Sequence, residues 1–154
     1  MEQTFIILKP STIQRSLVGD VLTRFQRKGL QITGIKMMQF DEQILRVHYA
    51  HLVDRPFFPS LVASMTRTPV IVAVLKGKDV VNVVRQMVGA TNCRAAAPGT
   101  IRGDFGMSGQ ENIVHASDSP ENAEIEIKRF FKPEEIFSYD MPTWNATYAP
   151  DEQN

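Results

Sequence analysis

The chain has 154 residues, with 17 basic and 17 acidic side chains, so its formal net charge is zero. This length favours one domain, 1–154, and the balanced charge argues against a broad cationic surface for duplex DNA or an acidic membrane. Because Cys93 is the single cysteine, the chain can form neither an intrachain disulfide nor a zinc site built from cysteines.

The amino-terminal stretch MEQTFIILKP contains an acid and an apolar run too short for a signal peptide. No segment approaches the roughly 20 apolar residues that span a bilayer. A chain with one cysteine also suits a reducing compartment. We therefore expect a cytoplasmic protein without membrane contact.

The first strand is expected at residues 4–8 (TFIIL), whose apolar and β-branched side chains are typical of a buried central strand. Ser16 is expected to cap a helix that carries apolar side chains at helical spacing and ends at Gly29. Residues 30–40 alternate imperfectly around Gly34, which predicts a second strand with a β-bulge.

Asp41 is expected to cap a short helix, and residues 57–60 (FFPS) open another. Residues 69–75 (PVIVAVL) are apolar throughout and predict a second buried strand. Asp79 is then expected to cap a valine-rich helix that stops at Gly89.

Residues 91–111 are long, rich in glycine and without period, and loops of this length in a compact domain are usually functional or disordered. Residues 113–114 are expected to form a last short strand, and the Ser119-Pro120 pair is expected to start a last helix. Few periodic signals occur after residue 138. Strands alternating with helices predict an α/β fold or α+β sandwich, with the sheet on one side and helices on the other.

Several common functional motifs are missing: there is no Walker loop, no GxGxxG and no GxSxG. His48 and His51 have a spacing that suits a metal, but no third ligand matches them, so two exposed histidines are the expected outcome. Cys93 lies beside Arg94, which allows a reactive thiolate, although an ordinary loop thiol is the simpler interpretation.

Three cations stand on separate segments: Lys9 ends a buried strand, Arg85 interrupts the valine-rich helix, and Arg102 lies in the long loop. Each alone is explained as an ordinary surface or loop cation. Together they are able to converge at one edge of the sheet, where arginine suits phosphate oxygens.

His115 ends the short strand of the stretch NIVHASD, and Ser117 and Asp118 come directly after it. Alone it is explained as an ordinary histidine at a strand end. Glu126, however, lies beside the apolar stripe of the next helix, where a carboxylate is able to reach back and orient an imidazole. A neutral imidazole is an available nucleophile at physiological pH, and the nearby cations favour phosphate as its cargo.

NIVHASD resembles the nucleoside diphosphate kinase signature N-x-x-H-G-S-D. The stretches FIILKP, LVGDVLTRF, HYAHLVDRPFF, PGTIRGDF and SPENAEIEI also resemble that family in their order and spacing. The resemblance covers roughly residues 3 to 137 and leaves a divergent tail, 139–154. It implies a ferredoxin-like fold, a four-stranded antiparallel sheet with helices packed on one face.

The implied activity is reversible, ping-pong transfer of the terminal phosphoryl of a nucleoside triphosphate, typically ATP, to a diphosphate such as GDP, through a phosphohistidine at His115. Mg²⁺ would be held mainly by the nucleotide's phosphates, with no direct protein ligand. The family is known as homo-oligomers, and a hexamer is expected here rather than a tetramer. Carried over by motif, the nucleotide would meet Lys9, Phe57, Arg85, Thr91, Arg102 and Asn112, while Tyr49, Ser117 and Glu126 would support His115.

Four positions depart from the family pattern. Residues 10–12 (PST) replace P-D-G or P-D-A, and Cys93 replaces the proline of T-N-P in a loop that takes part in subunit contacts. Gly109 replaces the apolar residue that covers the base opposite Phe57, unless Met107 substitutes for it. Ala116 replaces the glycine after the histidine, which would be unfavourable if this position needs a positive φ.

Two other functions compete with the kinase. A catalytically inert nucleotide-binding protein on the same fold is disfavoured because His115, Lys9 and Arg102 are all present. A single-strand nucleic-acid binder using Phe57 is disfavoured by the zero net charge and the lack of an aromatic platform, so no nucleic-acid partner is expected.

Overall fold

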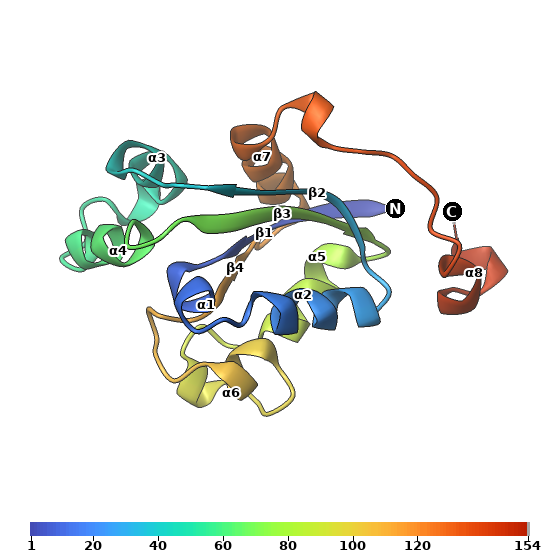
Figure 1. Cartoon of the computed structure of the whole chain (residues 1–154), viewed down its shortest axis with the longest axis horizontal. Helices are drawn as coiled ribbons and strands as arrows, with labels where there is room; N and C mark the ends of the chain where they lie inside the picture. The colour runs from blue at the N-terminus through green and yellow to red at the C-terminus, as the bar shows by residue number, and fades with distance from the viewer. Residues whose placement is uncertain (154) are drawn as a thin grey trace.

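The computed structural model describes residues 1–153 and is built around a four-stranded sheet in the order β2-β3-β1-β4 (Figure 1). Every neighbouring pair of strands is antiparallel, as the family resemblance implied. The strands are β1 (Glu2–Leu8), β2 (Gln31–Met38), β3 (Val70–Gly77) and β4 (Val114–Ala116).

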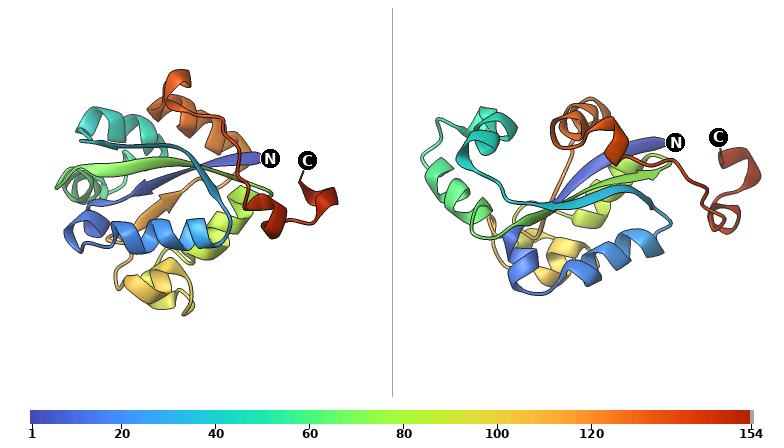
Figure 2. Two further views of the ribbon diagram at one scale, coloured as in Figure 1. Left: turned by 45° about the vertical axis from the view of Figure 1, so that its right-hand side comes forward. Right: turned by 45° about the horizontal axis from the view of Figure 1, so that its top comes forward.

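Helices cover both faces of the sheet, with α3, α4 and α7 on one side and α2 and α5 on the other (Figures 1 and 2). Phe5 and Ile7 of β1 pack with the first group, and Ile6 and Leu8 with the second. The expectation of helices on one face only was therefore wrong. Because β1 is apolar at successive positions, both of its faces need cover. The helices are α2 (Val18–Arg27), α3 (Glu42–His48), α4 (Phe58–Met65), α5 (Val80–Val88) and α7 (Pro120–Phe130).

Three local predictions are confirmed. The register of β2 against β3 shifts between Ile32 and Gly34, where the bulge was expected. The Asp41 carboxylate accepts the Ile44 amide at 2.9 Å and caps α3. The Ser119 hydroxyl accepts the Asn122 amide at 3.1 Å and caps α7, which fixes where this helix leaves β4.

Of two further predicted caps, Ser16 does not occupy the N-cap position of its helix, and Asp79 occupies it without a side-chain cap. Ser16 has a φ of 56° and precedes Leu17, the residue that leads into α2, because a separate short helix, α1 (Pro10–Gln14), occupies the turn after β1. Asp79 is left-handed, with φ 51°, and makes no side-chain cap. Instead the Glu2 carboxylate accepts the Val81 amide at 2.9 Å, so a residue distant in sequence caps α5.

The long segment 91–111 contains more regular structure than its sequence suggested. It holds a 3-10 turn, Cys93–Ala95, and helix α6 (Ile101–Phe105), capped by Thr100, whose hydroxyl accepts the Gly103 amide at 3.0 Å. Cys93 is buried against Gly106, where any side chain would collide with its sulfur. This segment therefore packs as a folded unit beneath α5.

The tail returns along the outer side of β2 and the turn before it (Figure 2). The Phe137 amide donates to the Thr33 carbonyl at 2.8 Å, and Trp144 Nε1 donates to the Gly29 carbonyl at 3.0 Å. The remaining short elements are 3-10 turns Ala50–Leu52, Pro133–Glu135 and Pro150–Glu152, and helix α8 (Trp144–Thr147). Over residues 1–153, no helix has the length and apolar character needed to cross a membrane.

Candidate active site

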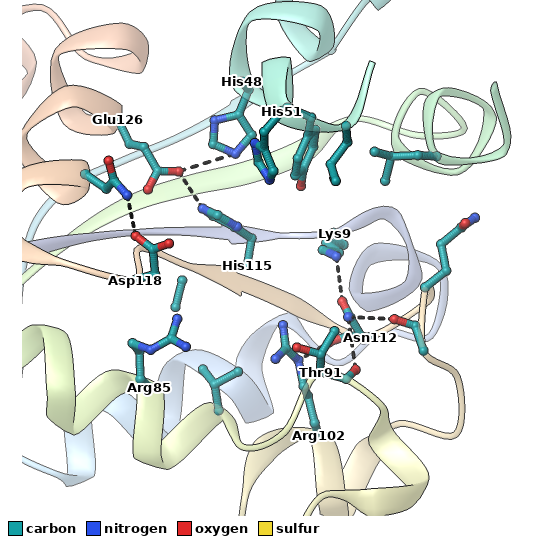
Figure 3. A pocket seen from close by; sticks show the side chains of 18 of the residues that line it. Lys9, His48, His51, Arg85, Thr91, Arg102, Asn112, His115, Asp118 and Glu126 are labelled. Atoms are coloured by element: carbon teal, nitrogen blue, oxygen red, sulfur yellow. Dashed lines mark hydrogen bonds and ion pairs between the residues drawn. The ribbon is translucent and has the colours of Figure 1, made fainter. Parts of the chain in front are cut away.

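A cavity of about 730 Å³ lies beside His115 and brings together residues from segments distant in the sequence (Figure 3). Lys9 enters it from the end of β1 and Arg85 from α5, while Arg102 comes from α6. Glu126 reaches it from α7, on the opposite side of His115 from the arginines (Figure 3). The three cations therefore converge near one imidazole, as their positions in the sequence predicted.

The His115 imidazole is paired with Glu126. Nε2 of the ring lies 2.6 Å from Glu126 Oε2, and the side chains are only 21% and 9% exposed. Burial raises the pKa of Glu126, but the hydrogen bond and charge of His115, with smaller contributions from Ser117 and His48, lower it overall. The carboxylate is thus ionised and can only accept, so the ring proton belongs on Nε2 and leaves Nδ1 with a free lone pair.

Lys9 and Asn112 form the second pair of the cavity. Lys9 Nζ donates to Asn112 Oδ1 at 2.5 Å, and the Asn112 amide nitrogen donates to the carbonyls of Gly109 and Thr91 at 2.9 and 3.2 Å. Burial, followed by the charge of Arg102, lowers the pKa of Lys9 to about 8. Asn112 thereby ties the loop around Gly109 and Thr91 to the end of β1.

Arg102 is held by backbone carbonyls. Its Nε donates to Asn112 at 3.1 Å, its Nη1 to Gly89 at 3.1 Å and its Nη2 to Val114 at 2.7 Å. Because Val114 directly precedes His115, the guanidinium is fixed to the strand that carries the imidazole. A guanidinium has five N–H donors, so two remain for an anion in the cavity.

The other residues implied by the resemblance are also placed here, with one exception. Tyr49, Phe57, Arg85 and Thr91 all line the cavity. The Phe57 ring is 47% exposed, whereas the Tyr49 hydroxyl is buried and has no hydrogen-bond partner among residues 1–153. Burial raises the pKa of this phenol. Ser117 does not line the cavity: it is fully buried behind His115, where its hydroxyl lies 3.4 Å from the Phe5 carbonyl.

His48 contradicts the expectation of two exposed histidines. His51 is exposed, but His48 is 8% exposed, and its Nε2 lies 3.4 Å from Glu126 Oε2. Arg129 Nη1 donates to its other nitrogen, Nδ1, at 3.0 Å. The sequence did indicate that His48 is buried, because it lies three residues after Leu45 on the buried face of α3. Arg129 lies three residues after Glu126 on α7, so these two side chains share a face of that helix.

The cavity is open at Gly109, where the family pattern has an apolar residue. Gly109 lines the cavity, and a Cβ built on it would meet no atom within 4 Å. Met107 is 73% exposed and is not among the lining residues, so it does not replace the missing apolar side chain.

The backbone strain next to His115 falls at Ile113 and not at Ala116. Ala116 pairs with Ile6 as an ordinary strand residue, whereas Ile113 has a φ of 72°. The Ile113 carbonyl accepts from the Lys9 amide at 2.9 Å and from the Thr12 hydroxyl at 2.5 Å. These two donors hold a β-branched residue in a conformation that it rarely adopts. Thr12, in the divergent stretch 10–12, thus supports the turn into His115.

Comparison with known proteins agrees with this geometry. The sequence pattern of the family described as "Nucleoside diphosphate kinase" matches residues 2–136. Curated proteins of that name include one from Parabacteroides distasonis, 56% identical over 152 residues and 99% of each chain. Another, from Pyrococcus horikoshii, is 50% identical over 141 residues and 90% of each chain.

Solved structures give the same result. A nucleoside diphosphate kinase from Halobacterium salinarum in complex with CDP aligns with a TM-score of 0.93 and 42% identity, over 96% of this chain and 99% of that one. The enzyme from Encephalitozoon cuniculi aligns with a TM-score of 0.91 and 40% identity, over 96% and 100%. The chain therefore belongs to the nucleoside diphosphate kinase family, and it is a phosphotransferase acting on nucleoside di- and triphosphates.

Proposed function

We propose that the family's reaction runs in this chain through Nδ1 of His115. The observation that carries the proposal is the 2.6 Å contact between His115 Nε2 and Glu126 Oε2. It places the ring proton on Nε2, away from the attacking lone pair, and sets a negative charge beside an imidazole that becomes positive as it reacts.

The first half-reaction forms a bond between Nδ1 and the terminal phosphorus and breaks the bond from that phosphorus to the bridging oxygen. The nucleoside diphosphate leaves with the bonding electrons, and His115 keeps the phosphoryl group. Glu126 stabilises the cationic ring while Nε2 stays protonated. A second nucleoside diphosphate then attacks the phosphorus by the reverse path, which restores the neutral imidazole.

The cations supply the stabilisation that phosphoryl transfer requires. Lys9, Arg85 and Arg102 line the cavity with His115, and Asn112 and Thr91 lie on the wall formed by the long segment. We assign these residues to the phosphates and ribose, because charge spread over phosphoryl oxygens is best met by fixed donors. Phe57 is assigned to the base. Because stacking on a ring tolerates every base, we expect ATP, GDP and related nucleotides all to be used. The complex of the Halobacterium salinarum relative with CDP supports nucleotide binding by this fold.

Mg²⁺ fits this site as a partner of the nucleotide. Within residues 1–153, one group of three metal-ligating side chains occurs, His48, His115 and Glu126, but Glu126 is already hydrogen-bonded to the nucleophile His115, and His48 lies 3.4 Å from the same carboxylate oxygen. Lys9, Arg85 and Arg102 would repel a free cation. We therefore propose that the ion arrives on the phosphates and neutralises their oxygens there.

Phosphohistidine formation gives the direct test. The protein is incubated with γ-labelled ATP and Mg²⁺, and acid-labile, base-stable label is expected on the chain. Addition of GDP should move this label to GTP. Absence of transferable label, or equal labelling of His115→Ala, would refute the mechanism.

We further propose a cytosolic homo-oligomer, with a hexamer as the expected size. Edge strand β2 leaves Ile35 and Met37 47% and 60% exposed, which supports a subunit contact there, and the lone Cys93 suits a reducing compartment. Sedimentation equilibrium measures the mass directly: a hexamer is expected, and a monomer would contradict the proposal.

A further inference from the structure

Arg129 contributes a contact to the active site that the transfer mechanism above does not use. It lies three residues after Glu126 on α7, so both side chains leave the same face of the helix. Its Nη1 donates to Nδ1 of His48 at 3.0 Å, across 81 positions of sequence. Arg129, His48, Glu126 and His115 thus form one continuous row of side chains.

This contact decides which nitrogen of His48 carries the proton. A guanidinium has donors but no acceptor, so Nδ1 of His48 must accept and cannot be protonated. Burial, then the charges of His115 and Arg129, lower the pKa of His48 to about 3, against the raising effect of Glu126. The ring is therefore neutral at physiological pH, and its single proton lies on Nε2.

Nε2 of His48 is directed at the oxygen that holds the nucleophile. It lies 3.4 Å from Glu126 Oε2, the same atom that His115 Nε2 contacts at 2.6 Å. The His48 side chain is 2% exposed, and Nε2 has no fully formed hydrogen bond to any described residue. A buried N–H without a full partner is costly, so an attraction of this donor to the carboxylate oxygen 3.4 Å away is favourable.

We propose that Arg129 is a positioning residue for phosphoryl transfer. By fixing the tautomer of His48, Arg129 keeps a second N–H directed at Glu126 Oε2. This N–H keeps the carboxylate ionised and aligned with His115. This inference rests on the proposed role of His115. If Arg129 did not hold Nδ1, the other tautomer would turn a bare lone pair of Nε2 toward the carboxylate. The two would repel, and Glu126 would turn away or take up a proton.

Nitrogen chemical shifts test the tautomer in the full-length wild-type protein. With histidine labelled at both ring nitrogens, the His48 resonances should report an Nε2–H tautomer at pH values both below and above neutrality. An Nδ1–H tautomer, or a charged His48 ring, would overturn the inference without any variant. The charged and titratable groups that act on this ring are Lys9, His115, Glu126 and Arg129.

Variants test the consequence for transfer. Arg129→Met removes the donor, Arg129→Lys keeps a cationic donor, and Lys128→Met is the matched control, since Lys128 is exposed on the same helix and pairs with Glu124. Single-turnover phosphorylation of His115 by ATP should slow by about tenfold in Arg129→Met, the order expected for one hydrogen bond in a charged network. Nucleotide affinity should stay unchanged, Arg129→Lys should recover most of the rate, and Lys128→Met should match the wild type.

The pH profile separates positioning from simple structural support. Loss of the second donor makes Glu126 easier to protonate, so the acid limb of the transfer rate should move to higher pH in Arg129→Met. If Arg129→Met leaves both the transfer rate and the acid limb unchanged, the inference is overturned. It is also overturned if thermal stability and nucleotide affinity fall in proportion to the rate, because Arg129 would then only support the structure. If the wild type itself acquires no label, the proposed function fails; if wild type and Arg129→Met are labelled equally fast, only this inference fails.

Discussion

Lys9 Nζ lies 2.5 Å from Asn112 Oδ1, so one hydrogen bond in the cavity joins two residues 103 positions apart in the chain. Asn112 is neutral and gives the ammonium no compensating charge. Burial and the neighbouring Arg102 therefore lower the pKa of Lys9 to about 8, with Glu111 opposing them. Among the three cations of the cavity, Lys9, which binds Asn112, is therefore the one that loses its proton most easily.

Nucleotide affinity should fall as the pH rises through about 8, because neutral Lys9 no longer attracts phosphate. Titration calorimetry with ADP on both sides of this pH measures the change. Lys9→Arg should bind with little pH dependence over the same range, since a guanidinium stays charged. A wild-type affinity that is flat across the range would contradict the assignment of Lys9 to the phosphates.

Glu126→Gln should slow phosphorylation of His115 by roughly ten- to hundredfold, because a hydrogen bond to a charged group contributes roughly 1.5–3 kcal/mol and the amide carries no charge. Rapid-quench kinetics with labelled ATP measure the rate. Nucleotide affinity should remain nearly unchanged. Glu124→Gln, two residues away and exposed, is the control and should behave as wild type; equal rates in the two variants would remove the orienting role of Glu126.

Gly109→Val should strengthen nucleotide binding by about threefold, since it would cover roughly 30 Å² of the base at about 25 cal/mol per Å². The backbone is not strained there, and the added Cβ meets no neighbour. Fluorescence or calorimetric titration with GDP gives the affinity. Met107→Ala is the control and should change nothing, because Met107 does not line the cavity. Weaker binding by Gly109→Val would show that the base lies elsewhere.

Ala116→Gly should lower the free energy of unfolding by roughly 0.5–1 kcal/mol, as glycine does within a strand. The opposite sign would be expected if position 116 had a positive φ, but the left-handed residue of this stretch is Ile113. Chemical denaturation at fixed protein concentration measures the difference. A more stable Ala116→Gly would mean that the strand pairing of Ala116 with Ile6 does not describe the protein in solution.

The elements that could be predicted from sequence are those with strong local patterns. The apolar runs of β1 and β3, the caps at Asp41 and Ser119 and the bulge near Gly34 each depend on a few neighbouring residues. Glu2 as the cap of α5 could not be predicted, because its partner amide lies 79 positions away. Local propensity carries no information about such contacts.

The residues of the site also divide into those that the sequence could predict and those that it could not. Residue type identified the candidates for phosphate chemistry: Lys9 and His115 at strand ends, Arg85 in a helix and Arg102 in the long loop. His48 was wrongly expected to be exposed, because its spacing to His51 suited a metal but no third ligand matched the pair. Its position three residues from Leu45 indicated burial. Arg129 gave no signal of its own, since a basic residue near the end of a helix is ordinary. Its partner on α3 became apparent only in three dimensions.

Helix α7 presents Asn122, Glu126 and Arg129 to the cavity from one face, at spacings of four and three residues. Each residue inserted into a helix turns all later side chains by about 100° and moves them about 1.5 Å along the axis. A single insertion between Asn122 and Glu126 would therefore rotate both later side chains out of the site at once. The number of residues between Asn122 and Glu126 is consequently as important to the arrangement of the cavity as the identity of those residues. The connection between α7 and α8 contributes no residue to the cavity, so its length has no such bearing on the site.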